Sequence, residues 1–596
     1  MVSTLALTLL ASLGAATARS APAPASVIRI NQLGYLPNGP KTAVMCVLPD
    51  SSPATRAASV EYIVQDTTGR RVMPPRRASA QGAFGPCAQT YRLDFSTLRR
   101  PGRYRIVAGS VRSAVVRIDA GAYAGAADTL LYYMRQQRSG WNPTLKDSVH
   151  KLDALIVDHP TRTGEFINVS GGWADAADYL QYVTTSATAT YVMLKAHRDH
   201  QRAFADRFLA NGAPGSNGLS DALDEARHGI EWLLRMFPDD STMFNQLADD
   251  RDHAFLDLPT TDTSDYGWGK GKERPVYPCT GKPQGLFNGR NRSRGYASTA
   301  GKYAAVFALA SRIYAQSDSA FARRLRDRAT AAYALGVKYP GPCQTAPGRA
   351  PYFYEEESWA DDMELGAAEL YALTGDRRYV QDALGYAAKE PVTPWMGADT
   401  ARHYEWYPWI NHGHDAVWRT GDAAAKRQMV SYYRQGLERV AARAKNGFRV
   451  GVPFIWCSNN LMSAFATQAL LYRRMTGDER FREYEAAALD WLFGANPWGV
   501  SMVIGLPWSG TWPRDPHSVM AMQVGIETQL GGLVDGPVYR SIFQNLRGVH
   551  LREADEYAAF NTGFIVYHDD EGDYSTNEPI MDGTGMLTYL LAALAP

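Results

Sequence analysis

Between residues 27 and 119, hydrophobic residues occur in short alternating or β-branched runs that are separated by clusters of Pro, Gly and Asp. Such runs are typical of strands, and the residues between them are typical of turns. We expect strands over 27–30, 42–45, 60–64, 91–95, 104–107 and 115–118. The last two runs flank Gly109-Ser110, which indicates a hairpin. This many strands in about 90 residues predict a small all-β sandwich.

After Gly121 the hydrophobic spacing becomes helical. The clearest helical face has spacings of four, four and three and consists of Leu461, Phe465, Ala469 and Tyr472. Ser458 is the candidate N-cap of this helix, and Gly477 is its candidate C-terminal stop.

Thr-Gly-Asp recurs at 374–376, 420–422 and 476–478, each time between two helix-like segments. The glycine can take the left-handed conformation that ends a helix, and the aspartate can accept the first N–H groups of the next one. These tripeptides predict helix hairpins that recur about every 50 residues. Serial hairpins predict an all-α solenoid or a closed toroid, with long loops at one end where a cleft can form.

The composition does not favour a highly charged partner. Lys plus Arg total 62 and Asp plus Glu total 61, so no strong field attracts nucleic acid or an anionic membrane. Most of the 33 Tyr and 14 Trp are expected in the core, and any surplus can stack on the apolar faces of sugars. A neutral ligand therefore fits the composition better.

The first 21 residues are typical of an export signal. An apolar run from Leu5 to Ala16 precedes the small-residue stretch 16–18, although no Lys or Arg comes before the run. The run is too short to span a bilayer, and no later stretch is long and apolar enough. We expect a secreted or periplasmic protein.

The five cysteines allow disulfides in an exported protein. Cys46 with Cys87 and Cys279 with Cys343 are candidate pairs, and isolated buried thiols are an equally good interpretation. Since no CxxC or Cys/His cluster has zinc spacing, and His412-Gly413-His414 lacks further ligands, we expect no metal centre.

Two acidic segments could carry chemistry. In 171–179, Asp175 and Asp178 lie three residues apart among small residues and beside Trp173. The competing interpretation is an ordinary acidic helix start. In 567–578, five acidic residues surround Tyr574, and the competing interpretation is a solvated loop or a calcium site. Hydrolysis of a glycosidic bond requires one protonated and one ionised carboxyl group, which these segments together can supply.

Four motifs resemble glycoside hydrolase family 9, in the subgroup with an N-terminal immunoglobulin-like domain. They are the start of the β-region at 30–35, the paired aspartates at 172–178, a histidine signature at 496–517, and an acidic signature at 567–578 with an Asp-Tyr-x-x-Asn-Glu core. Their order along nearly the whole chain makes the set specific. The resemblance implies an immunoglobulin-like sandwich at 27–119 and an (α/α)6 barrel at 121–596.

The resemblance also implies roles in inverting hydrolysis of a β-1,4-linked glucan. Asp178 matches the general base, Asp175 the residue that helps to hold the attacking water, and Glu578 the general acid. Asp569 matches the aspartate of the acidic signature, and His517 matches a histidine that contacts the sugar. Trp173 and Tyr574 are predicted aromatic contacts to substrate. No cofactor is expected, and a structural calcium ion is not placed.

Three departures from the family pattern leave the substrate open. Ala177 replaces a glycine, which is tolerated only at negative φ. Val519 stands where the family has an arginine, and an asparagine after Glu578 is missing. The alternatives are an exo-acting hydrolase of short gluco- or glucosamine-configured oligosaccharides and a non-catalytic glycan-binding protein. A polysaccharide lyase is disfavoured because such enzymes neutralise uronic acids with Arg or Lys.

Overall fold

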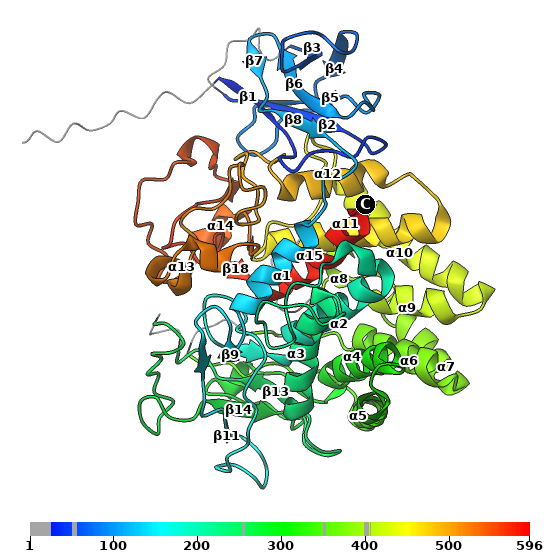
Figure 1. Ribbon diagram of the computed structural model, residues 1–596, viewed down its shortest axis with the longest axis vertical. Helices are drawn as coiled ribbons and strands as arrows, with labels where there is room; N and C mark the ends of the chain where they lie inside the picture. The colour runs from blue at the N-terminus through cyan, green and yellow to red at the C-terminus, as the bar shows by residue number, and fades with distance from the viewer. Residues whose placement is uncertain (1–24, 50–56, 253–256, 350–352, 398–404, 406) are drawn as a thin grey trace, which may run out of the picture.

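The computed structural model describes residues 25–49, 57–252, 257–349, 353–397, 405 and 407–596. It consists of a β-domain stacked on one end of a larger helical domain (Figure 1). The predicted export signal lies outside the described residues. Within them, no helix has the length and apolar character needed to cross a membrane.

Two antiparallel sheets form the β-domain. One has the order β1 (Ser26–Arg29), β2 (Thr42–Val47) and β5 (Gln89–Asp94). The other has the order β4 (Arg76–Ser79), β3 (Ser59–Asp66), β6 (Gly102–Ala108) and β7 (Val111–Arg112), with β8 (Val116–Ile118) also on β6. In β6, Tyr104, Ile106 and Ala108 are buried while Arg103 and Arg105 are exposed, which is the alternation of a half-buried strand. The predicted all-β sandwich is confirmed.

The predicted hairpin exists, but its second strand is different. Ala108 pairs with Val111 across Gly109-Ser110, so β7 completes the hairpin. The run that we expected to do so is β8, which pairs with the beginning of β6.

Both candidate disulfides form. Cys46 is bonded to Cys87 in the β-domain, and Cys279 is bonded to Cys343 in the helical domain. Cys457 is a free thiol. Each bond closes a long loop, which restricts the unfolded chain.

The helical domain is a closed double ring. Within the described residues, the inner ring consists of six largely buried helices, α2 (Val183–His200), α4 (Ala297–Tyr314), α6 (Ala360–Thr374), α9 (His412–Thr420), α11 (Ser458–Thr476) and α15 (Met581–Leu594). Their outer partners are, in the same order, α3 (Asp221–Met236), α5 (Ser319–Lys338), α7 (Arg377–Ala387), α10 (Ala423–Arg443), α12 (Arg482–Leu492) and α1 (Ala126–Gln136). Since α1 packs on α15, the first and last helices close the ring. The (α/α)6 toroid is confirmed.

The Thr-Gly-Asp tripeptides join α6 to α7, α9 to α10 and α11 to α12, as predicted. Gly375 and Gly477 are left-handed, at φ 72° and 71°, whereas Gly421 is extended at φ −77°. Asp376 and Asp422 cap the following helices. Asp478 instead accepts from the N–H of Arg480, ahead of α12.

The prediction that Ser458 caps α11 is wrong. Cys457 takes the cap position at φ 60°, and Ser458 is the first helical residue. Its hydroxyl donates to the carbonyl of Pro537, so a tertiary contact has replaced the local one.

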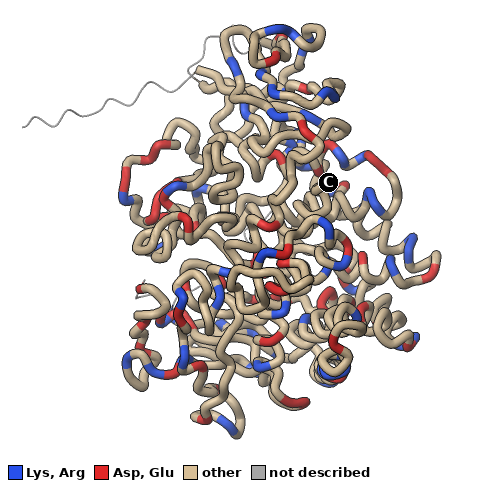
Figure 2. The backbone as a smooth tube through the Cα atoms, viewed as in Figure 1, with Lys and Arg blue, Asp and Glu red and all other residues tan. Residues whose placement is uncertain are grey.

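The β-domain docks on the region around α12. Asn31 Nδ2 donates to Asp490 Oδ1 over 2.8 Å, and Phe84 enters an aromatic cluster with Phe448 and Trp491 at ring distances of 5.5 and 6.2 Å. Basic and acidic residues are interspersed over both domains (Figure 2), in keeping with the balanced composition.

Candidate active site

The paired aspartates lie in a loop that leads through β12 (Gln181–Tyr182) into α2, and not at a helix start as the spacing alone indicated. Asp178 Oδ1 accepts from the N–H of Leu180 over 3.0 Å, which fixes a local turn. Ala177 has no positive φ, so the alanine in place of the family glycine causes no backbone strain.

Asp175 is held from two sides. Its Oδ1 accepts from the hydroxyl of Thr185 over 2.5 Å, and its Oδ2 accepts from the phenol of Tyr354 over 3.1 Å. Its carbonyl accepts from the N–H of Met581, the first residue of α15. Burial and the nearby carboxyls of Asp582 and Asp178 raise the pKa of Asp175 well above its ordinary value, because a second negative charge in a poorly solvated site is unfavourable.

Glu578 reaches the paired aspartates from the other end of the chain. Its Oε1 accepts from the N–H of Ala177 over 3.0 Å, across 401 residues of sequence. The glutamate precedes β18 (Pro579–Ile580), which pairs with β15 (Leu533–Val534). The N–H of Asp535 donates to the Glu578 carbonyl over 3.0 Å. The two acidic segments therefore meet at the N-terminal ends of α2 and α15.

Asp569 organises the loops beside this centre. Its carboxylate accepts from the N–H groups of Arg514 and Asp515 and from Nδ2 of Asn577, over 2.7, 3.0 and 3.1 Å. Burial nevertheless raises its pKa to about 6. These contacts join the histidine segment to the acidic segment, and the predicted catalytic role of Asp569 stays a prediction.

His517 and Tyr574 form one aromatic group with Trp456. The ring of Tyr574 lies 5.9 Å from His517 and 5.3 Å from Trp456. His517 Nδ1 donates to the carbonyl of Glu571, because a carbonyl can only accept. Burial lowers the pKa of His517, which favours the neutral ring.

The prediction that Trp173 contacts substrate does not fit its burial. The indole is 0% exposed, and its Nε1 donates to Glu225 over 2.8 Å. It packs 5.4 Å from His228 on α3. Trp173 therefore packs between the aspartate loop and α3, and its ring is not accessible to a sugar.

Two buried acidic residues near the centre lie outside the sequence motifs. Asp535 accepts from Nε1 of Trp456 over 2.7 Å, and burial raises its pKa. Asp582 accepts from Nδ2 of Asn460 over 3.2 Å, and burial raises its pKa to about 6. For Asp582, the sequence does contain a signal: it is an acidic residue in a largely apolar segment. That segment forms α15, which is buried from Met581 to Ala592.

Val519, at the position where the family pattern has an arginine, makes an apolar contact. It is 2% exposed and packs with Ala174 and Tyr179, the neighbours of the paired aspartates. Among the described residues, no ion pair involves Asp175, Asp535 or Asp582. The centre therefore contains several carboxyl groups without a cation beside them among the described residues.

No group of three or more His, Cys, Asp or Glu residues in the described part of the chain could hold a metal ion. His412 and His414 are the first turn of α9, and His414 Nδ1 is bonded to Glu364 over 2.7 Å. The calcium site that the acidic segment left open stays unplaced.

A helical double ring with two acidic segments converging at one end is the architecture of a carbohydrate-cleaving enzyme. The sequence pattern of the family described as Glycosyl hydrolase family 9 matches residues 123–591, and that of the Cellulase N-terminal ig-like domain matches residues 23–113. The chain belongs to glycoside hydrolase family 9, and it is therefore a glycoside hydrolase.

Two curated relatives show how far the similarity extends. Endoglucanase C of Cellulomonas fimi is 27% identical over 82% of this chain, which spans 45% of that protein's length. A xyloglucan-specific endo-β-1,4-glucanase of Bacteroides ovatus is 26% identical over 88% of each chain. The predicted hydrolysis of a β-1,4-glucan is consistent with both names.

Solved structures agree with the fold. A metagenome-derived family 9 endoglucanase superimposes with a TM-score of 0.73 at 28% identity, covering 96% of this chain and 99% of that one. The family 9 endoglucanase J30 has a TM-score of 0.72 at 25% identity, with 94% and 99% coverage.

Proposed function

We propose that the protein is a secreted or periplasmic, inverting hydrolase of β-1,4-linked glucan, with Glu578 as general acid and Asp178 as general base. The proposal rests chiefly on the hydrogen bond from the Ala177 N–H to Glu578, because it brings the acid next to the base. The relatives named as endoglucanases favour internal cleavage of a polymer.

The reaction requires only water as co-reactant. Asp178 removes a proton from water as its oxygen attacks the anomeric carbon, and Glu578 protonates the departing glycosidic oxygen. Inverting enzymes keep the two carboxyl groups about 6.5–9.5 Å apart to leave room for the water. Asp175, held by Thr185 and Tyr354, orients the water, and His517 and Tyr574 contact the sugar. The mechanism calls for no cofactor.

An exo-acting hydrolase of amino sugars is the second candidate, favoured by the surplus of carboxyl groups. Val519 occupies the position of the family arginine, and among the described residues the carboxyl groups of Asp175 and of the buried Asp535 and Asp582 form no ion pair. A substrate carrying an ammonium group would supply the missing positive charge.

A panel of oligosaccharides and polymers tests both candidates. Turnover of cello-oligosaccharides, xyloglucan and mixed-linkage glucan with a rapid fall in viscosity supports the endo-glucanase. Preferential release of monomers from chitosan oligosaccharides would replace it with the second candidate. Proton NMR of the first product should show the α-anomer from a β-linked substrate, whereas an initial β-anomer would contradict the roles of Asp178 and Glu578.

A further inference from the structure

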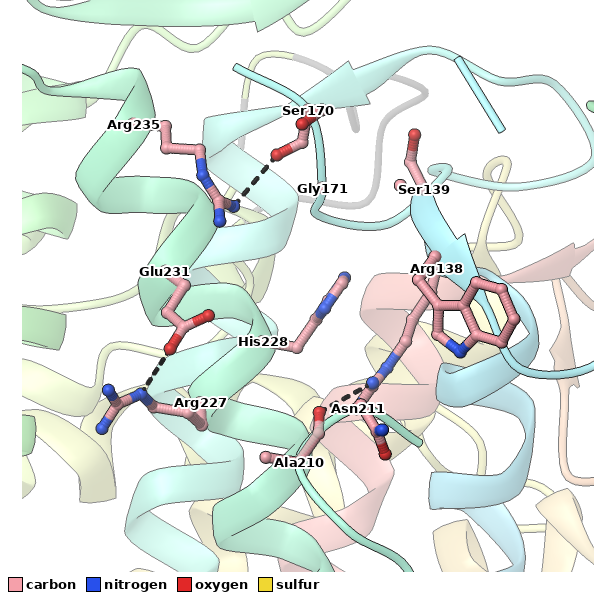
Figure 3. A pocket seen from close by; sticks show the side chains of 12 residues that line it. Arg138, Ser139, Ser170, Gly171, Ala210, Asn211, Arg227, His228, Glu231 and Arg235 are labelled. Carbon is pink, nitrogen blue, oxygen red and sulfur yellow. Dashed lines mark hydrogen bonds and ion pairs between the residues drawn. The ribbon is translucent and has the colours of Figure 1, made fainter. Parts of the chain in front are cut away.

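A cavity lies beside the beginning of the loop that carries the paired aspartates (Figure 3). It has a volume of about 470 Å³ and lies between α3 and the strand β9 (Gly140–Asn142). The segment Ser170–Gly171 forms its third side. Cavities of about 300–1,000 Å³ hold small ligands.

The walls of this cavity are fixed by buried bonds. Arg138 is 2% exposed and makes two hydrogen bonds to Glu225, over 3.1 and 2.7 Å, and a third to the carbonyl of Ala210 over 2.9 Å. Arg235 Nη1 donates to the carbonyl of Ser170 over 3.0 Å. A ligand would therefore meet a preorganised surface, which lowers the entropic cost of binding.

His228 offers a hydrogen-bond acceptor to the cavity. Its Nε2 lies 2.8 Å from the carbonyl of Gly172, and a carbonyl can only accept, so Nε2 carries the proton. Burial lowers the pKa of His228 to about 3, so the ring is neutral and Nδ1 is an unprotonated acceptor. Among the described residues, Nδ1 has no hydrogen bond, and Figure 3 shows the ring projecting into the cavity.

The remaining lining supplies an apolar face and donors. Trp141 is 46% exposed although it lines the cavity. Asn211 uses its side-chain oxygen to accept from Ala213, and its amide nitrogen has no partner among the described residues. A flat aromatic face with separate donors and acceptors matches a sugar ring, which is apolar above and below and hydroxylated at its edge. Of the three arginines in the lining, Arg138 is paired with Glu225 and Arg227 with Glu231, and Arg235 donates to a carbonyl group.

We propose that this cavity is an accessory binding site for a neutral β-linked saccharide chain, with Trp141 as its stacking platform. The proposal rests on the function proposed above. Gly171, on the cavity wall, and Asp178, at the catalytic centre, are separated by seven residues, so their Cα atoms are at most about 25 Å apart. A saccharide chain bound in the cavity would therefore be held close to the catalytic centre.

Binding stoichiometry tests the site without turnover. Cellotetraose is titrated calorimetrically into the Glu578→Gln protein and into the double variant that also carries Trp141→Ala. Two binding events are expected in the first, and the second should lose one or bind it roughly tenfold more weakly, the weight of a lost aromatic platform. Tyr132→Ala, an aromatic on α1 that is 36% exposed and does not line the cavity, is the matched control.

Kinetics provide the second measurement. In the otherwise native enzyme, Trp141→Ala should lower kcat/KM on soluble mixed-linkage glucan several-fold more than kcat/KM on a chromogenic cellobioside. If the wild type hydrolyses both substrates but Trp141→Ala changes neither the stoichiometry nor this ratio, the accessory site is wrong and the proposed function stands. A wild type that neither hydrolyses nor binds any β-1,4-glucan would overturn both.

Discussion

At the scale of single residues, the site combines two acidic segments, one with the proposed general base and the other with the proposed general acid. Asp178 lies in a turn fixed by Leu180, and Glu578 is anchored through Ala177. The main chain of one segment thus positions the side chain of the other. Small movements of either loop therefore change the acid–base geometry, on which proton transfer depends.

Replacement of Asp178 by Ala should remove most turnover and leave the fold intact. A general base typically contributes about 10²–10⁴-fold, so kcat/KM should fall within that range. Circular dichroism and the melting temperature serve as folding controls. Wild-type-like activity in a folded Asp178→Ala protein would exclude its role as the base.

Asp569 should act through the loops that it joins. Asp569→Ala leaves the N–H groups of Arg514 and Asp515 without their acceptor, so the His517 segment should shift and kcat should fall. Asp569→Asn retains an acceptor oxygen and should restore much of the activity. Equal losses in both variants would indicate that the negative charge itself is required.

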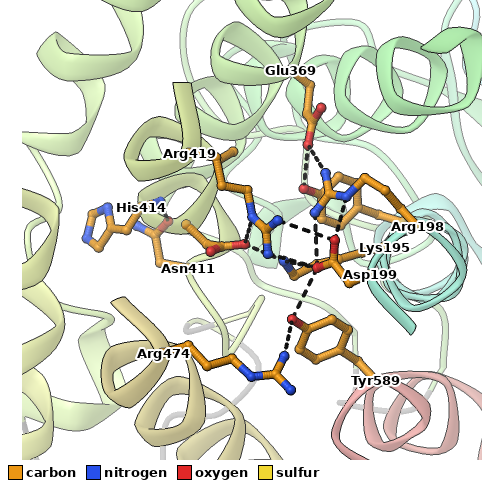
Figure 4. A network of polar contacts seen from close by, with 12 residues as sticks. Lys195, Arg198, Asp199, Glu369, Asn411, His414, Arg419, Arg474 and Tyr589 are labelled. Atoms are coloured by element: carbon orange, nitrogen blue, oxygen red, sulfur yellow. Dashed lines mark hydrogen bonds and ion pairs between the residues drawn. The ribbon is translucent and has the colours of Figure 1, made fainter. Parts of the chain in front are cut away.

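At the scale of helices, a polar network joins the inner helices (Figure 4). Its residues on α2 and α15 lie toward the C-terminal ends of these helices, whereas the proposed base and acid precede their N-terminal ends. Lys195, on α2, is 0% exposed and bonds Asp415 on α9 and Asp199 on α2. Asp199 also accepts from Arg419 and from Tyr589 on α15, over 2.8 and 3.2 Å. Lys195 thus compensates carboxylates from two helices together with Arg198 and Arg419.

Lys195→Met should destabilise the protein, because the buried Asp415 would lose its only fully buried cation and keep Arg419 alone. Removing one partner of a buried ion pair costs about 3–5 kcal/mol. Arg480→Met is the control, since its pair with Glu438 is half exposed and worth about 0–1 kcal/mol. Urea unfolding of both variants gives the comparison, and equal effects would show that the network does not stabilise the ring.

The elements could be predicted from the sequence to different degrees. Strands and helix hairpins follow from local spacing and turn residues, and they are present. Features that depend on distant partners were not predictable: Ser458 gives its hydroxyl to Pro537 instead of capping α11, and Trp173 is covered by α3. Motifs located Asp175, Asp178 and Glu578. Asp535 and Asp582 lie outside those motifs and join the site only through the closed ring.

At the scale of the whole molecule, the β-domain supports the toroid. Phe84 and Asn31 both contact the α12 region, and no acidic pair of a hydrolase lies at 27–119. Deleting the β-domain should therefore lower the melting temperature before it changes the products made from cello-oligosaccharides. A stable truncated enzyme that had lost only its binding to long chains would identify the domain as a substrate module.

The domain interface should weaken as the pH rises. Burial raises the pKa of Asp490 to about 7, although the Asn31 amide opposes this shift. The neutral carboxyl therefore contributes stability that is complete below the unfolded pKa of about 4 and is lost as the pH rises through 7. Asp490→Asn should flatten the fall in melting temperature between about pH 4 and pH 7. Parallel curves for the two proteins would contradict this assignment.

The pairing of α1 with α15 also has a consequence for synthesis. The proposed base precedes α2, the proposed acid precedes α15, and the last helix packs on the first one where the ring closes. In a nascent chain, Asp178 is synthesised early. Its proposed partner, Glu578, is added only near the end of translation. Any product terminated before that point lacks both the proton donor and the closing helix. Under the proposed mechanism, the enzyme can therefore become active only after its last helix has been made.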